Sequence, residues 1–246
     1  MNQSSRTALI TGASRGLGRE IARLFAARGM NLVITARGDE ALQEVATELG
    51  AQAKVVALAG DVADPAHAER LLRAAREQFG GIDVLVNNAS TIGPSPMPRL
   101  EVYQLSALAR VYRVNVVAPL HLIRLVLPGM RERGHGVIIN VTSDAAIQPY
   151  AGWGGYGSSK AALEQLSQVL AAEVEGSGVR VYVVDPGDMN TQMHREAEPD
   201  TDLSNLPGPE VPAPAFLYLV EEETAPFGRF EAQTLAAARL ESSATE

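Results

Sequence analysis

Several residue types are absent or scarce in this chain of 246 residues. It has no cysteine, which excludes disulfides, thiol nucleophiles and cysteine-based metal sites and fits a cytoplasmic protein. Its four histidines are scattered without the spacing of metal ligands, so we expect no bound metal. No stretch approaches the ~18 apolar residues that a membrane span needs, so no membrane association is predicted.

Basic residues are also outnumbered. The formal net charge is −8, from 21 Lys and Arg against 29 Asp and Glu, and this balance argues against a nucleic-acid surface. Lysine occurs only at Lys54 and Lys160. A hydrophobic content of 46% and a charged content of 20% are ordinary for a globular protein. A chain of this length can form one domain with a substantial core, so we expect a single domain over residues 1–246.

Apolar runs alternate with helical patterns along the chain. Strands that are apolar throughout are buried on both faces, so the alternation predicts an α/β fold with a doubly wound, Rossmann-like parallel sheet. The expected strands are residues 8–10, 31–35, 53–58, 83–88, 136–141 and 179–184. The expected helices are residues 17–28, 39–49, 65–79, 100–133 with a bend near Pro119, and 156–175.

A glycine-rich stretch, residues 11–18, follows the first expected strand and opens the first helix. Glycines let the backbone approach a diphosphate closely, and the N–H groups of a helix N-terminus attract anions. The spacing is G-x-x-x-G-x-G, which differs from the G-x-G-x-x-G of the common dinucleotide fingerprint. A tight turn without a ligand is the alternative.

Tyr156 and Lys160 are four residues apart in an expected helix and therefore share one face. A phenol with a pKa near 10 is a poor acid–base group at neutral pH, and a cation one turn away favours the phenolate. Ser143 follows the fifth expected strand, where its hydroxyl can bind a substrate carbonyl. Together these groups can hold a carbonyl oxygen and pass it a proton while hydride reaches the carbon. A chance pairing of tyrosine and lysine is the alternative.

In their order along the chain, these motifs resemble the short-chain dehydrogenase/reductase family, classical type, over about residues 7–191. The resemblance implies that Tyr156 is the general acid/base and that Lys160 lowers its pKa and holds the nicotinamide ribose. It also implies that Ser143 orients the substrate oxygen and that Asn115 holds a water linking Lys160 to solvent. The matching stretches are T-G-x-x-x-G-x-G at 11–18, D-V at 61–62, N-N-A at 87–89, Asn115, Ser143, Y-x-x-x-K at 156–160 and P-G at 186–187.

The resemblance further implies a set of cofactor-binding residues. An NAD enzyme of this architecture has an acidic residue after the second strand, but this chain has Ala36. Arg15 and Arg37 can instead clamp a ribose 2′-phosphate, which favours NADP(H); two solvated surface arginines are the alternative. The full set is Gly12, Ser14, Arg15, Gly16, Leu17, Gly18, Arg37, Asp61, Val62, Asn88, Tyr156, Lys160, Pro186, Gly187 and Thr191.

Simpler roles exist for two of these residues. Asp61 could cap a helix, and Asn115 could be a buried helix residue that bonds only to backbone.

We therefore expect an NADP(H)-dependent oxidoreductase that interconverts a ketone or aldehyde and an alcohol. The alternatives are a non-catalytic dinucleotide-binding regulator, a structural subunit and, within the class, a 3-ketoacyl carrier-protein reductase. For the last, Arg131 and Arg133 give little support for docking an acidic carrier. The expected pocket walls are mostly apolar, which favours a medium-sized ketone: Ala145, Ile147, Tyr150, Trp153, Met189, Met193 and His194.

Two further expectations concern regions outside the motifs. The proline-rich, acidic stretch 188–214 is expected to be a mobile substrate lid, with an ordinary surface loop as the alternative. The C-terminus departs from the family pattern, and only a short seventh strand is expected near residues 228–233. The stretches 114–127 and 160–174 are apolar on more than one side, which predicts a homo-oligomer, a tetramer or a dimer. Cover by the lid or tail is the alternative.

Overall fold

A computed structural model describes residues 5–243. Its strands form one parallel sheet in the order β3-β2-β1-β4-β5-β6-β7. The chain winds outward on one side from β1 and then on the other from β4, which is the doubly wound α/β topology expected from the sequence. The strands are β1 (Thr7–Thr11), β2 (Asn31–Ala36), β3 (Val55–Ala59), β4 (Val84–Asn87), β5 (Gly136–Val141), β6 (Val179–Asp185) and β7 (Phe227–Glu231).

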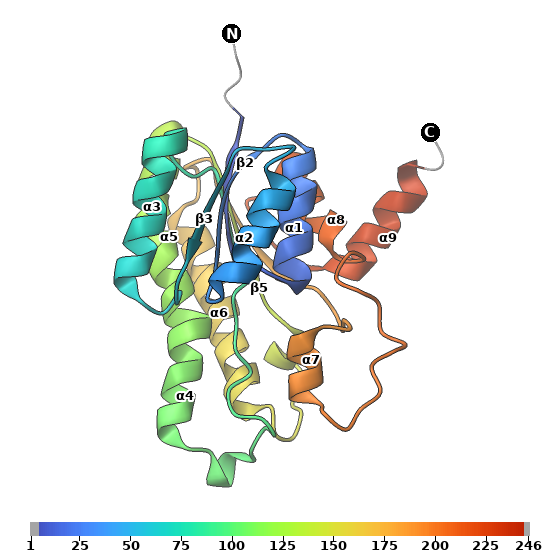
Figure 1. The fold of residues 1–246 in the computed structure, drawn as a ribbon. Helices are drawn as coiled ribbons and strands as arrows, with labels where there is room; N and C mark the ends of the chain where they lie inside the picture. The colour runs from blue at the N-terminus through green and yellow to red at the C-terminus, as the bar shows by residue number, and fades with distance from the viewer. Residues whose placement is uncertain (1–4, 244–246) are drawn as a thin grey trace.

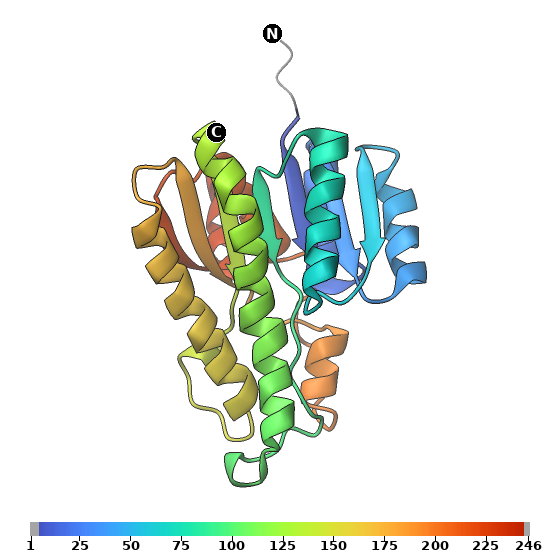
Figure 2. The same cartoon turned by 90° about the vertical axis from the view of Figure 1, so that its left-hand side faces the viewer.

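Helices cover both faces of the sheet (Figure 1 and Figure 2). One face carries α1 (Gly16–Ala27), α2 (Asp39–Leu49), α8 (Ala213–Glu221) and α9 (Ala232–Ser243). The other carries α3 (Pro65–Phe79), α5 (Ala118–Arg133) and α6 (Gly154–Glu173).

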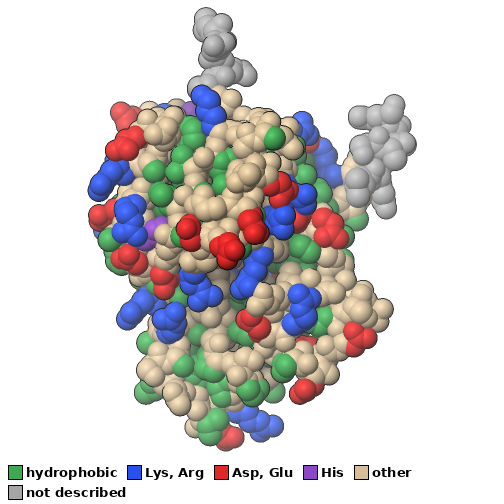
Figure 3. Space-filling view, in the orientation of Figure 1, with side chains coloured by type: hydrophobic (Ala, Val, Ile, Leu, Met, Phe, Trp, Pro, Cys, Tyr) green, Lys and Arg blue, Asp and Glu red, His purple; other side chains and the backbone are tan. Residues whose placement is uncertain are grey.

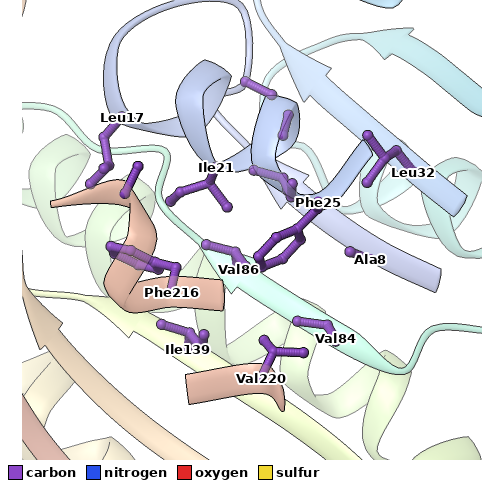
Figure 4. Packing of buried hydrophobic residues seen from close by; sticks show 14 of the residues in the cluster. Ala8, Leu17, Ile21, Phe25, Leu32, Val84, Val86, Ile139, Phe216 and Val220 are labelled. Carbon is purple, nitrogen blue, oxygen red and sulfur yellow. The ribbon is translucent and has the colours of Figure 1, made fainter. Parts of the chain in front are cut away.

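The core on the α1 face joins the two ends of the chain. Phe25 of α1 and Phe216 of α8 are completely buried, and both lie over strand residues such as Val86 (Figure 4). Burying an aromatic or branched side chain of this kind contributes about 2 kcal/mol. The sequence pattern does not predict α8, yet its packing on α1 ties the C-terminal region to the sheet.

The long helical region is interrupted, which the sequence does not show. A 3₁₀ turn covers Leu100–Val102, α4 begins only at Leu105 and ends at Tyr112, and a π-helical turn covers Arg113–Val117 before α5. The break has a local cause, because Pro119 has no N–H to donate to the carbonyl of Asn115, four residues earlier. The bend expected near Pro119 is thus a change of helix type just before it.

This region also corrects the expectation about membrane spans. Leu105–Arg133 is long and apolar enough, by length and composition alone, to cross a membrane, with a mean hydropathy of 1.2. Half of its 18-residue apolar window is buried inside the protein, and Leu122 and Val126 of α5 pack in the core with α3 and the sheet. A core helix passes the same test of length and composition.

The C-terminal region has more regular structure than the sequence predicts. The seventh strand exists and pairs in parallel with β6, and α9 follows it at once. The guanidinium of Arg239 lies 4.3 Å from the ring centroid of Tyr218 in α8. Within the expected lid, α7 (Gln192–Ala197) is helical, and the lid's last two residues belong to α8.

Candidate active site

A cleft of about 700 Å³ opens at the carboxyl ends of the strands. Its lining includes residues that follow the strands and residues of α7, which is where doubly wound sheets bind their ligands. Figure 3 shows basic side chains across the middle of this face and hydrophobic ones gathered below. The cleft brings together most of the residues singled out in the sequence: Gly12, Ser14, Arg15, Gly16, Leu17, Arg37, Asp61, Val62, Asn88, Ser143, Tyr156, Lys160, Pro186, Gly187 and Thr191.

Two of the predicted residues, Gly18 and Asn115, do not line the cleft. Gly18 supports the glycine turn from behind, because a Cβ there would lie 2.4 Å from the carbonyl oxygen of Gly12. The turn itself needs glycine, since Gly12 has a φ of +69° and Gly16 a φ of +54°. Asn88, directly after β4, holds the turn by donating its side-chain N–H to the carbonyl of Thr11 at 2.9 Å.

The Asn115 side chain is used entirely within the protein. Its Nδ2 donates to Ser159 Oγ and to the carbonyl of Thr91, each at 2.9 Å. Its Oδ1 accepts from the Thr91 N–H at 2.9 Å and from Ser90 Oγ at 3.1 Å. The side chain therefore fixes the loop after β4 to the start of α6. The Asn115 backbone carbonyl cannot receive the usual i+4 hydrogen bond, because Pro119 has no N–H.

Tyr156 is almost fully buried near the floor of the cleft. Burial raises the pKa of its phenol, and hydrogen bonds with Ser143 and Ser90 lower it by less. The net shift of this pKa is upward, whereas the resemblance implies a lowering by Lys160. In this arrangement the phenol keeps its proton at neutral pH.

Lys160 is 2% exposed, and its Nζ donates to the carbonyl of Val141 at 2.8 Å. The same Nζ lies 5.4 Å from the centroid of the Tyr156 ring. Burial lowers the pKa of Lys160 to about 8, while the negative charges of Asp185 and Glu164 raise it.

A buried ionic network lies behind Lys160. Arg229 of β7 donates from Nε to Glu164 Oε1 at 3.2 Å and from Nη2 to Asp185 Oδ2 at 3.3 Å. Glu164 also accepts from Thr142 Oγ1 at 2.7 Å, and Asp185 accepts from the Gly187 N–H at 3.0 Å. Burial raises the pKa of Asp185, and Arg229 opposes that shift. No sequence motif marks this network, because its members are far apart in the chain.

The part of the cleft expected to bind the adenosine takes its polar and charged groups from separate turns. Arg15 and Arg37 line the cleft, and Arg15 donates to the side chain of Gln192 in α7. Asp61 does not cap α3, since Asp64 does so by accepting from the Ala66 N–H at 3.0 Å. Instead Asp61 accepts from the Ala63 N–H at 2.9 Å.

The substrate end differs most from expectation. Of the predicted walls, Trp153, Met189, Met193 and His194 line the cleft. Ala145 is buried behind it, and Ile147 and Tyr150 are 60% and 47% exposed outside it. The cleft is also less apolar than expected, because Asp144, Asp185, Asp188 and Arg195 line it as well.

Comparison with known proteins matches the chain to one family throughout. A family model described as short chain dehydrogenase matches residues 6–202. The Escherichia coli 3-oxoacyl-[acyl-carrier-protein] reductase is 34% identical over 92% of this chain and 93% of its own. The 2-(R)-hydroxypropyl-CoM dehydrogenase of Xanthobacter autotrophicus is 40% identical over 77% of this chain and 76% of its own.

Solved structures agree with the sequence match. A short chain dehydrogenase from Pseudomonas syringae superposes with a TM-score of 0.86 and 33% identity, over 93% of this chain and 94% of its own. A metagenomic short-chain oxidoreductase in complex with NADP has a TM-score of 0.78 and 28% identity, over 93% and 97%. A Brucella melitensis 3-ketoacyl-(acyl-carrier-protein) reductase complexed with NADH has a TM-score of 0.83 and 28% identity, over 92% of this chain and 96% of its own. The chain belongs to the short chain dehydrogenase family of oxidoreductases.

Proposed function

We propose that this protein is an NADP(H)-dependent oxidoreductase that interconverts a ketone or aldehyde and an alcohol, with Tyr156 as the proton donor and acceptor. The observation that carries the proposal is the convergence of Ser143, Tyr156 and Lys160 in one cleft beside the glycine turn. A cytoplasmic location belongs to the same proposal and rests on the lack of cysteine.

The residues present fit a dinucleotide. The glycine turn is free of side chains where a diphosphate would approach, and it leads into the N-terminus of α1. Lys160 would hold the nicotinamide ribose, and the Pro186–Gly187 turn would border the nicotinamide. When bound, the reduced cofactor supplies hydride.

The chain's own residues would handle the substrate oxygen and its proton. Ser143 and Tyr156 hydrogen-bond the carbonyl oxygen, which polarises it, and Tyr156 then gives its proton to that oxygen as negative charge develops there. Protonated Lys160 stabilises the phenolate that remains. A water on the Asn115 carbonyl returns a proton from solvent.

The choice of NADP(H) rests on charge. No acidic residue stands at the end of β2, where Ala36 lies, and the arginines Arg15 and Arg37 line the same part of the cleft. A 2′-phosphate finds two guanidinium groups there and no repelling carboxylate from β2. The related structures carry either NADP or NADH, so this preference depends on the chain's own residues.

A 3-ketoacyl carrier-protein substrate is the second candidate, and the names of the Escherichia coli and Brucella melitensis relatives favour it. The two arginines considered for docking do not support it. Arg131 and Arg133 lie at the end of α5, next to the start of β5. This is the amino-terminal end of the strands, opposite the cleft. Arg131 donates to the Glu173 carbonyl. Arg133 donates to the Ile82 carbonyl and pairs with Asp83.

We also propose that the protein is a homo-oligomer, with a tetramer favoured over a dimer. Three apolar side chains on the α5 and α6 side of the protein are exposed: Val117 just before α5 (56%), Leu120 on α5 (38%) and Val169 on α6 (45%). A second copy would bury these outer faces. Light scattering after size exclusion at micromolar concentration should give a multiple of the chain mass, and the mass of one chain would refute the proposal.

The catalytic proposal is tested by NADPH oxidation at 340 nm against a panel of ketones and aldehydes that includes a 3-ketoacyl thioester. We expect turnover with at least one carbonyl compound and none without protein. Cofactor binding, seen as enhanced NADPH fluorescence, without turnover on any member of the panel would favour the non-catalytic alternative.

A further inference from the structure

The hydroxyl of Ser143 is already engaged by the residue that follows it. Ser143 Oγ donates to Asp144 Oδ1 at 2.9 Å and accepts from the Ala145 N–H at 3.2 Å. A carboxylate oxygen can only accept, and a serine hydroxyl has a single hydrogen, so that hydrogen is used by Asp144. Ser143 cannot give it to a substrate carbonyl while this bond exists.

The Asp144 carboxylate is held in place from its other side. Its Oδ2 accepts from the hydroxyl of Tyr150 at 2.6 Å. This bond, which favours the neutral phenol, raises the pKa of Tyr150. Asp144 is half-buried and lines the cleft, while Tyr150 is not among the cleft-lining residues. The carboxylate therefore faces the substrate with its Oδ1, beside the hydroxyl that must bind the carbonyl.

Binding of a carbonyl forces an exchange of hydrogen bonds. When Ser143 turns its hydrogen to the substrate oxygen, Asp144 Oδ1 loses its donor, and a charged acceptor left without a donor in a partly buried place is costly. The carbonyl oxygen and Oδ1 would both lie about 2.8 Å from Ser143 Oγ. A hydroxyl or ammonium on the carbon next to the carbonyl reaches the same space and can replace the lost donor.

We propose that Asp144 determines specificity, and that the site takes ketones or aldehydes bearing a hydrogen-bond donor on the carbon next to the carbonyl. A carboxylate at that carbon would instead face Asp144 and is rejected. This inference rests on the proposed carbonyl reduction, whose substrate class it narrows.

Basic side chains of the cleft hydrogen-bond to residues other than Asp144. Arg15 donates to Gln192 and Arg195 donates to Asn190. His194 uses its Nδ1 toward the Met189 carbonyl at 3.2 Å. Asp144 has no cationic partner among the described residues, whereas Asp185, which also lines the cleft, is paired with Arg229.

Four ketones of matched size test the inference: 1-hydroxy-2-butanone, 3-pentanone, 1-methoxy-2-butanone and 2-oxobutanoate. With NADPH we expect kcat/KM for the hydroxyketone to exceed that for each of the others by ~10-fold or more. In Asp144→Ala the kcat/KM values for the hydroxyketone and 3-pentanone should become equal within about twofold. The kcat/KM for 2-oxobutanoate should rise relative to both. Asp144→Asn keeps an acceptor oxygen and should retain part of the hydroxyl preference while accepting the keto acid.

Asp188→Asn is the matched control, because it removes one negative charge from the same cleft and does not contact Ser143. It should keep the hydroxyketone preference. An equal kcat/KM for the hydroxyketone and 3-pentanone in the wild-type protein, or an unchanged preference in Asp144→Ala, would overturn the inference.

Binding to the NADP⁺ complex, which cannot transfer hydride to a ketone, separates this inference from the proposed function. Calorimetry should show tighter binding of the hydroxyketone than of 3-pentanone, and the difference should vanish in Asp144→Ala. Selective binding without turnover would refute the proposed reduction and leave the role of Asp144 standing. Unselective binding, or no binding of any of the four, would refute that role.

Discussion

The two ends of the cleft are built differently. The end proposed to bind the phosphates is one contiguous turn, Thr11–Gly18, held by Asn88 directly after β4. The substrate end is assembled from the residues after β5, from the start of α6 and from α7, which are distant in sequence. A local motif can therefore predict the first end, whereas the second depends on how the chain folds. The first end is suited to a constant ligand, and the second can vary with the substrate.

Replacing Tyr156, where the two ends meet, should have the largest effect. Tyr156→Phe removes the proposed proton donor and preserves the ring that packs beside Trp153 at a centroid distance of 5.7 Å. We expect kcat to fall ~10²-fold or more with cofactor affinity retained. Steady-state kinetics and NADPH fluorescence titration measure the two quantities. Turnover near the wild-type rate would show that another group donates the proton.

The phosphate end is tested by removing its two arginines together. Arg15→Ala/Arg37→Ala should lower kcat/KM for NADPH by ~10-fold or more, because charge-assisted hydrogen bonds to a 2′-phosphate are lost, and should change the value for NADH little. The control is Arg73→Ala/Arg76→Ala, which removes two exposed arginines of α3. If the ratio of the two kcat/KM values does not change, the arginines do not select the cofactor.

The network behind Lys160 predicts a pH effect. Burial lowers the pKa of Lys160 to about 8, so the ammonium is lost above that pH and the reductive kcat/KM should fall there. Asp185 raises this pKa, so Asp185→Asn should move the fall to lower pH. Asp39→Asn, an exposed site outside the cleft, is the control. A fall at the same pH in Asp185→Asn would remove Asp185 from this role.

The same shift has a consequence for folding. The unfolded chain holds the Lys160 proton up to its ordinary pKa of 10.5, whereas the folded chain releases it at about 8. Between these values the unfolded state binds more protons, so the contribution of Lys160 to the free energy of unfolding rises with pH. That contribution is most unfavourable below about pH 8, which is where the charged lysine is needed for reduction.

The smallest effect is expected in the lid at the substrate end. Residues 188–212 should exchange amide hydrogens more slowly once NADP(H) is bound, because ordering the segment closes the cleft. α8 should not change, since Phe216 is buried in the core. Equal exchange of residues 188–212 with and without cofactor would mean that the segment does not gate the site.

The strands could be predicted because buried parallel strands are continuous apolar runs, and all seven exist near the expected places. The start of α4 at Leu105 could not be predicted. Leu100 and Leu105 fit the apolar spacing of a helix, yet they are 69% and 80% exposed, so the apolar pattern does not mark a buried face there. The π-helical turn depends on a missing N–H at Pro119, which sequence periodicity does not register. α7 lies within the proline-rich stretch 188–214 and α8 begins at its end, so the prolines there mask the pattern of short helices.

The site follows the same division. Tyr156 and Lys160 could be predicted from one helical spacing. Asp185 and Arg229 could not, because they are 44 residues apart and meet only through the pairing of β6 with β7. Asp144 is next to a predicted residue, but its effect on Ser143 depends on a rotamer that no spacing encodes.

The central claim is that hydride reaches a carbonyl carbon while Tyr156 supplies the proton. A single-turnover reaction of the protein with NADPH deuterated at both C4 positions and 1-hydroxy-2-butanone tests it, with mass spectrometry of the product. The account predicts a diol carrying one carbon-bound deuterium from the wild-type protein and almost none from Tyr156→Phe at the same cofactor occupancy. Bound cofactor with no deuterated product from this ketone or any other carbonyl compound of the panel would contradict the claim and favour a regulator or a structural subunit.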